Sequence, residues 1–453
     1  MEWNGFAIDV PYFNSQAAIA AADQAAARTK LKSLLSFLGV ASDDPDAIWT
    51  SGPQTIRLLH DDLGLPPSPV WFKGRVKVDD GERKTDRVAM EWVASHSPEG
   101  PALELVRELM NLRRIISSTK YLVKLPEYVA PDGFVHTVCG PAGDDDDRVG
   151  AITGRLAMKK PEAAQIPRDK RKDRYHVRRG FVAPDGMALV VRDYTALEVV
   201  IKANIADMLW GDDLLLQLTA PGQDIHAYNA HKVFGEILKW RTPSGRPVAD
   251  FAPGEFKGHP ELDWFREAVK AVWYKLEYGG TVHGFATSLK DQQGNPVGMT
   301  RAQEIVGALY EAVPAIPRFQ AWVGAVLERD GGICAWDGRF ADYSWLIARD
   351  ALGTRPEKRW GFAAAQRAAQ NFPMQAFGAH IIGCAMVDAM GSPELARLGA
   401  VQELQVHDEL RWRCPAGNEK RVGEVTDEIM SGAFPLKNLR TAGGSGRTWE
   451  DCK

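Results

Sequence analysis

The segment LGAVQELQVHDELRWRCP, residues 398–415, limits the possible folds more than any other part of the chain. Its two apolar-rich runs and their short polar centre predict two strands joined by a tight turn. The centre holds His407, Asp408 and Glu409, where a buried strand would continue with apolar residues. Either these residues merely cap a surface hairpin, or the hairpin presents them to a site that needs carboxylates.

A further carboxylate lies where another strand is predicted to end. The segment DGMALVVRDYTALEVVIKANIADML, residues 185–209, passes from a strand-like run into a helical pattern, with Asp193 at the junction. If both strands belong to one sheet, Asp193 can meet Asp408 and Glu409. Clustered carboxylates repel unless a cation lies between them, and an oxygen-only site suits Mg²⁺. Two Mg²⁺ ions about 4 Å apart can promote phosphoryl transfer.

The segment FREAVKAVWYKLEYGG, residues 265–280, predicts a helix with a functional stripe. Arg266, Lys270, Tyr274 and Tyr278 recur every four residues and therefore share one face. The two cations could meet phosphates, and the two rings could lie against a base or sugar. The alternative is an amphipathic helix with snorkelling basic residues and core tyrosines.

The remaining pattern predicts an α+β chain. Residues 16–40 and 101–125 have apolar residues at helical spacing, residues 220–367 look mostly helical between Pro/Gly-rich loops, and residues 363–390 form a long helical pattern. The length of 453 residues, of which 45% are hydrophobic, predicts two or three subdomains. The five scattered cysteines show no metal-ligand spacing and indicate a reducing compartment. No apolar run approaches the ~20 residues of a membrane span.

Two charged segments leave their roles open. The net charge is −4, but residues 168–179, RDKRKDRYHVRR, are strongly basic. This segment could be a solvated face or a strip that contacts phosphates. The run Asp144–Asp147 is more typical of a mobile acidic loop than of a metal cage.

Taken together, these motifs resemble those of family A DNA polymerases, the group of bacterial DNA polymerase I. DYTALE from Asp193, the stripe from Arg266 to Tyr278 followed by Gly279, and VHDE from Val406 resemble motifs A, B and C, in the family's order. Other similar words run from Asn4 to Glu450: NGFAID, DGFVHT, TGRL, DIH, TRAQEI, WDGR, RAAQNFPMQ and GSGRTWE.

The resemblance implies a right-hand architecture with an antiparallel palm and helical fingers and thumb. We expect residues 1–125 to form the thumb, 126–219 the first part of the palm, 220–366 the fingers and 367–453 the second part of the palm. A 3′–5′ exonuclease domain commonly precedes the thumb in relatives. Because the thumb-like match begins at residue 4, we expect no proofreading domain in this chain.

The resemblance also implies roles around the metals and the triphosphate. Asp193 and Asp408 would hold two Mg²⁺ ions, with Glu409 as an auxiliary carboxylate. Lys270 would face the triphosphate and could protonate the leaving group. The other implied phosphate contacts are Arg266, Arg168 and His226. His407 would support the primer terminus, or it is a neutral structural histidine at the turn.

Further roles concern the sugar and the duplex. Glu198 matches the steric gate that excludes a ribose 2′-hydroxyl, Tyr274 matches a position linked to dideoxynucleotide acceptance, and Tyr278 would stack near the templating base. The residues that match duplex contacts are Arg155, Arg367, Asn371 and Gln375. Arg and Gln donors suit minor-groove acceptors, which are nearly the same in every correct pair.

Some positions depart from the family pattern. Val200 stands where relatives often have Arg, Lys275 replaces a small residue, Glu277 is expected near the nascent pair, and His380 stands where Asp is common. None of these changes removes a predicted metal ligand or Lys270. We therefore expect an active enzyme with altered fidelity, speed or nucleotide preference.

The sequence thus predicts a template-directed DNA polymerase that acts on primer-template DNA and deoxynucleoside triphosphates. The alternatives are a single-subunit RNA polymerase or primase-like enzyme, and a catalytically inactive primer-template binding module. We expect a cytoplasmic monomer in a bacterium or phage-infected cell. A separate exonuclease or a processivity partner is compatible with this expectation.

Overall fold

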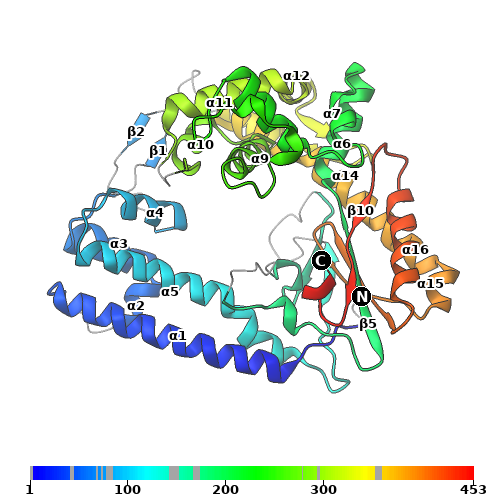
Figure 1. Cartoon of the computed structure of the whole chain (residues 1–453), viewed down its shortest axis with the longest axis horizontal. Coiled ribbons are helices and arrows are strands. Elements are labelled where there is room, and N and C mark those ends of the chain that lie inside the picture. The colour runs from blue at the N-terminus through cyan, green and yellow to red at the C-terminus, as the bar shows by residue number, and fades with distance from the viewer. Residues whose placement is uncertain are drawn as a thin grey trace.

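The computed structural model describes residues 4–40, 45–67, 70–72, 75–77, 85–141, 153–166, 174–277, 279–292, 296–351 and 360–452. The described chain combines many helices with a small antiparallel sheet, so the predicted α+β class is confirmed. Figure 1 shows three groups of elements: a pair of long N-terminal helices, a second group of helices on the opposite side of the view, and the sheet at the side between them.

The two predicted helices of the first quarter form and pack along each other. They are α1 (Val10–Phe37) and α5 (Pro101–Lys124), and the carboxylate of Asp9 caps α1 by accepting from the backbone N–H of Tyr12. Shorter elements lie between the two in the chain: α2 (Pro45–Thr50), α3 (Gly52–Ile56), a π-helical turn (Arg57–Asp62), the hairpin β1 (Val70–Phe72) and β2 (Arg75–Lys77), and α4 (Arg87–His96), which packs on α5. Apolar side chains of the described helices in this group form a separate core.

The central sheet brings distant parts of the chain together. Its strands are β5 (Met187–Tyr194), β8 (Val401–Val406), β9 (Glu409–Pro415), β10 (Thr441–Ala442) and β11 (Ser445–Gly446). The order is β10-β5-β9-β8, β11 also pairs with β5, and each pairing is antiparallel. The predicted hairpin is therefore β8–β9, and the strand that ends near Asp193 is its neighbour.

Helices cover one face of this sheet. The elements are α6 (Leu197–Trp210), α14 (Trp360–Gly391), α15 (Pro393–Arg397) and α16 (Glu419–Gly432). Tyr194, Phe372 and Trp412 belong to the core between these helices and the sheet. On the other face, Phe6, Phe181 and Trp449 belong to a second core, to which the short strands β3 (Val138–Pro141) and β4 (Leu156–Lys159) are attached.

The remaining helices pack around buried aromatic residues. The elements are α7 (Leu214–Leu218), α8 (Ile225–Ala230), a π-helical segment (His231–Ile237), α9 (Asp263–Glu277), α10 (Val282–Ser288), α11 (Gly298–Ala312), α12 (Ala315–Asp330), β6 (Gly332–Cys334), β7 (Phe340–Asp342) and α13 (Ser344–Ala351). Phe234, Phe265 and Trp273 lie in the core that α7 to α11 share, which also takes Val199 and Ala203 from α6. β6, β7 and α13 contribute to the core that covers the sheet. Helix α6 therefore packs into both neighbouring groups.

Short 3₁₀ turns complete the described elements: Leu125–Tyr128, Ala163–Gln165, Arg178–Gly180, Val248–Asp250, Pro253–Glu255 and Glu450–Cys452. Among the helices of the described ranges, none combines the length and apolar character needed to cross a membrane.

A buried charge network fixes the hairpin to the rest of the sheet core. The Glu403 side chain is fully buried and pairs with Arg411 at 3.2 Å and with Arg413 at 2.8 Å. Arg411 is also almost fully buried, and Arg413 donates to the carbonyl oxygens of Asn4 and Gly5. The network therefore ties the N-terminal segment to β8 and β9.

We predict that Glu403→Ala lowers the free energy of unfolding by about 3–5 kcal/mol, because it leaves the buried Arg411 without its carboxylate. Chemical denaturation measures the change. The matched control is Asp185→Asn, which breaks an exposed pair with Arg447 and should have a far smaller effect. Equal effects of the two substitutions would show that the network does not stabilise the fold.

Candidate active site

Strand pairing places Asp193 beside the hairpin turn. Asp193 stands opposite Glu409 in the β5–β9 register, and the next residue, Tyr194, donates its backbone N–H to the carbonyl oxygen of Asp408 at 3.1 Å. The side chains of Asp193 and Asp408 are both partly exposed. The turn itself needs His407 in the left-handed region, with φ of 55°, a conformation that histidine adopts more readily than most residues.

Glu409 lies at the same strand end but in a different environment. Its buried carboxylate accepts a hydrogen bond of 2.6 Å from Trp449 Nε1 and pairs with Arg178 at 3.3 Å. The guanidinium of Arg178 also stacks 3.9 Å from the Trp449 ring centre. Both interpretations of the basic segment are therefore wrong for Arg178, which is neither solvated nor open to a phosphate. Its charge instead neutralises Glu409.

This difference leaves Asp193 and Asp408 as the pair that suits hard cations. Both offer carboxylate oxygens on adjacent strand ends, and the third carboxylate of the turn is already balanced by Arg178. Oxygen-only donors of this kind suit Mg²⁺, which usually takes one or two protein carboxylates and keeps waters or substrate oxygens as its other ligands. The described residues hold no cluster of three or more His, Cys, Asp or Glu with metal-binding geometry.

The basic end of the predicted stripe is held by a helix cap. Arg266 on α9 donates from Nε to Asp224 at 2.8 Å, and Asp224 caps α8 by accepting from the backbone N–H groups of His226 and Ala227. Burial acts to raise the pKa of Asp224, but the bonds from Arg266 and Ala227 lower the pKa below its ordinary value. Asp224 therefore stays ionised and orients Arg266.

His226 is the one imidazole that packs against this stripe among the described histidines. Burial lowers the pKa of His226 to about 4, and the positive charges of Lys270 and Arg266 add to the effect. Its ring lies 5.6 Å from that of Tyr274, and its Nδ1 is buried without a hydrogen-bond partner in the described structure. The imidazole is therefore neutral near pH 7, and its buried Nδ1 atom is left unsatisfied.

Electrostatic effects place Tyr274 of α9 near residues of the other two predicted motifs. Burial raises the pKa of Tyr274, and the negative charges of Glu277, Glu198 and Asp408 raise this pKa further. Glu198 also accepts a hydrogen bond of 3.2 Å from Arg155. The structure thus brings Tyr274 close to Glu198 and Asp408, which belong to the other two predicted motifs. Glu277, expected near the nascent pair, is buried and pairs with Lys202.

The predicted duplex-contacting residues of α14 lie along one helix face. Arg367, Asn371 and Gln375 are four residues apart, and the first two are linked by a bond from Asn371 Nδ2 to the Arg367 carbonyl. Gly279 packs on Arg367 so closely that a Cβ would lie 2.5 Å from Arg367 Cγ. This contact requires glycine at the end of the stripe.

Arg339 is a residue whose contacts the sequence did not reveal. Its guanidinium donates to the carbonyl oxygens of Thr153 at 2.6 Å and Ala376 at 2.9 Å. It fills the space where a Cβ on Gly154 would stand. Arg339 thus holds the segment that carries Arg155 against α14. The motifs TGRL and WDGR, which contain Thr153 and Arg339, are visible in the sequence. Neither motif indicates that these two residues are in contact.

Two predicted substrate contacts, Arg168 and Tyr278, lie outside the described residues, as does the acidic run Asp144–Asp147. Their predicted roles stay predictions.

Comparison with known proteins identifies the family. The sequence model of DNA polymerase family A matches residues 44–250 and 259–451. This chain belongs to DNA polymerase family A. It is 29% identical over 409 residues to the thermostable DNA polymerase I of Thermus thermophilus, covering 89% of this chain and 42% of that protein. It is 30% identical over 402 residues to DNA polymerase I of Mycobacterium bovis, covering 87% of this chain and 37% of that protein. The chain thus spans about two fifths of the curated relatives' length.

A solved structure shows the same fold. The POL domain of Pol1 from M. smegmatis, in complex with DNA primer-template and dNTP, matches this family A chain with a TM-score of 0.75 and 23% identity. The match covers 99% of this chain and 68% of that one. The predicted right-hand polymerase fold is therefore confirmed.

We predict that His226 titrates far below an ordinary histidine. The pKa of His226 is about 4 in the folded protein, whereas a histidine in the unfolded chain has a pKa of about 6.5. Between these two pH values the unfolded state therefore binds more protons than the folded state. Stability should therefore fall as the pH drops from 6.5 towards 4, by up to roughly 3 kcal/mol. NMR titration measures the pKa, and His226→Gln should remove this part of the pH dependence. A pKa near 6.5 would contradict the prediction.

Proposed function

We propose that this chain is a template-directed DNA polymerase that extends a primer 3′ end with deoxynucleoside triphosphates by two-metal phosphoryl transfer. The observation that carries the proposal is the strand pairing that brings Asp193 beside Asp408, with Tyr274 of the α9 stripe near Asp408 and Glu198. The proposal includes the thumb at residues 1–125, the palm at 126–219 and 367–453, and the fingers at 220–366. The proposal also includes a monomeric protein with a cytoplasmic location.

Asp193 and Asp408 would hold two Mg²⁺ ions, which supply charge neutralisation and activate the attacking oxygen when bound. Glu409 serves this site by position rather than by charge, because Arg178 and Trp449 already bind its carboxylate. We assign Glu409 the task of holding the turn so that Asp408 points away from the buried network. His407, exposed at the same turn, is placed to support the primer terminus.

The incoming triphosphate would lie along the basic end of α9. Arg266, oriented by Asp224, and Lys270 supply positive charge, and Lys270 is the proposed proton donor to the leaving group. His226 would donate a hydrogen bond as a neutral imidazole, which is consistent with its low pKa. Arg168 completes the proposed set of phosphate contacts.

The sugar and base would lie at the aromatic end of α9. Glu198 would exclude a 2′-hydroxyl, and its pairing with Arg155 would orient its carboxylate. Tyr274 would contact the sugar, and Tyr278 would stack near the templating base. Arg155, Arg367, Asn371 and Gln375 would follow the minor groove, where donors can check pair shape without reading the sequence.

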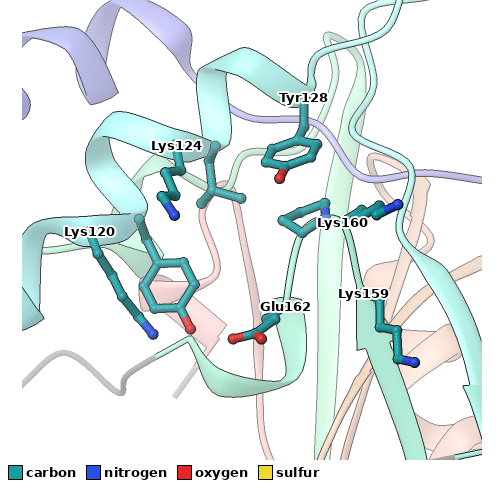
Figure 2. Close-up of a pocket in the computed structure, with 9 residues that line it drawn as sticks. Lys120, Lys124, Tyr128, Lys159, Lys160 and Glu162 are labelled. Atoms are coloured by element: carbon teal, nitrogen blue, oxygen red, sulfur yellow. The ribbon is translucent and has the colours of Figure 1, made fainter. Parts of the chain in front are cut away.

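A lysine-lined cavity extends the proposed nucleic-acid interface. The cavity, of about 420 Å³, lies between the end of α5 and the segment after β4 (Figure 2). Its lining includes a buried tyrosine hydroxyl, that of Tyr121, which has no hydrogen-bond partner in the described ranges. Four lysines and one carboxylate line it, so positive charge is in excess: Lys120, Lys124, Lys159, Lys160 and Glu162. We assign this cavity to phosphates of the bound duplex.

We expect the wild-type protein to extend a primer on a recessed DNA template with Mg²⁺ and deoxynucleotides. Asp408→Asn, which keeps the side-chain shape but removes a charge at the metals, should lower the rate by at least about a thousandfold. Single-turnover primer extension measures the rate, and the matched control is Asp185→Asn at an exposed position. Preferred ribonucleotide addition would favour the RNA polymerase alternative. DNA binding without any extension would favour the inactive module.

We also expect the double substitution Lys124→Gln and Lys160→Gln to weaken duplex binding by the same factor whatever the DNA sequence. Because each phosphate neutralised by a lysine contributes about 0.9 to the slope of log affinity against log salt, the slope should become less steep by about 1–2. Fluorescence anisotropy over a salt series measures it. Lys420→Gln, on the exposed face of α16, is the control. An unchanged slope would remove the cavity from the interface.

A further inference from the structure

A buried ion pair joins the two helices that carry the proposed nucleotide contacts. Lys202 on α6 donates from Nζ to Glu277 Oε1 on α9 at 2.7 Å. Their side chains are only 4% and 6% exposed. Lys202 Nζ also lies 5.3 Å from the ring centre of Phe319 on α12. Three helices therefore meet at this pair of charges.

The pair lies one helical turn behind the proposed sugar contacts. Glu198 precedes Lys202 by four residues on α6, and Tyr274 precedes Glu277 by three residues on α9. Residues at these spacings share one helix face. Any shift of α6 against α9 at the ion pair would therefore move Glu198 relative to Tyr274.

Stability alone does not account for this pair. Burying two charges brings a desolvation penalty, so well-packed apolar residues of similar volume would stabilise the junction as well or better. Glu277 Oε2 is buried without a hydrogen-bond partner in the described part of the chain, so even the pair as built leaves one oxygen unsatisfied. A directional contact does what apolar packing does less well, because it fixes the register of one helix on the other.

We propose that Lys202 and Glu277 are positioning residues that set sugar selection. They hold α6 and α9 so that Glu198 and Tyr274 close the space that a ribose 2′-hydroxyl would need. This assignment rests on the proposed function. It adds two residues that touch neither substrate nor metal, and it explains why charges occupy a core position between two helices of the site.

The test replaces the pair with apolar residues of similar size, Lys202→Met together with Glu277→Leu. The double variant keeps the packing without leaving a lone buried charge. Single-nucleotide addition to a primer-template measures kcat/KM for deoxy- and ribonucleotides. Deoxynucleotide addition should persist, whereas the preference over ribonucleotides should fall by at least about tenfold, which corresponds to about 1.4 kcal/mol. The control is Asp207→Asn, on the same helix as Lys202, which breaks an exposed pair with Lys437 and should leave the preference unchanged.

A second background separates positioning from general loosening. If the pair acts through Glu198, the double variant should lower the preference in the wild-type background but not in a Glu198→Ala background. Glu277→Gln keeps the side-chain shape and should also lower the preference, so the test does not depend on the double variant folding. An unchanged preference in these variants overturns the assignment alone. A wild-type protein that extends no primer overturns the proposed function and the assignment with it.

Discussion

The site depends on the antiparallel pairing of β5 with β9. The last bond of this pairing runs from the Tyr194 backbone N–H to the carbonyl oxygen of Asp408. This pairing joins a strand from the middle of the chain to a hairpin near its end. Since side chains alternate across a strand, a shift of one residue would turn Asp193 to the opposite face. The position of the two carboxylates is therefore a consequence of strand register, which the two cores on either side of the sheet maintain.

Buried charges then orient the parts that apolar packing leaves less specified. Within the hairpin, Glu403 of β8 pairs with two arginines of β9. Arg178 and Trp449 bind Glu409 next to the turn, and the Lys202–Glu277 pair joins α6 to α9. Apolar burial supplies most of the folding free energy but has little direction. Ion pairs and hydrogen bonds have direction, which suits contacts around a site whose side chains must keep their relative positions.

Much of the fold follows from local patterns. The helical spacing of residues 101–125 predicts a helix that the structure contains, because burial of one face imposes that periodicity. The apolar-rich runs around the hairpin predict its two strands, which are buried on both faces. The strands β10 and β11 are two residues each, too short for any periodicity, so only their pairing with β5 defines them. Arg178 shows the same limit, since a basic segment does not say which of its residues is buried.

The sequence by itself determined the family, the order of the motifs and the residue types available for chemistry, because these depend on which side chains stand at which spacing. Only the tertiary structure decided which charges balance one another. It assigned Arg178 to Glu409, Arg155 to Glu198 and Lys202 to Glu277, pairs whose members lie far apart in the sequence. Such pairings arise from helix packing and strand register, which no single stretch of sequence contains.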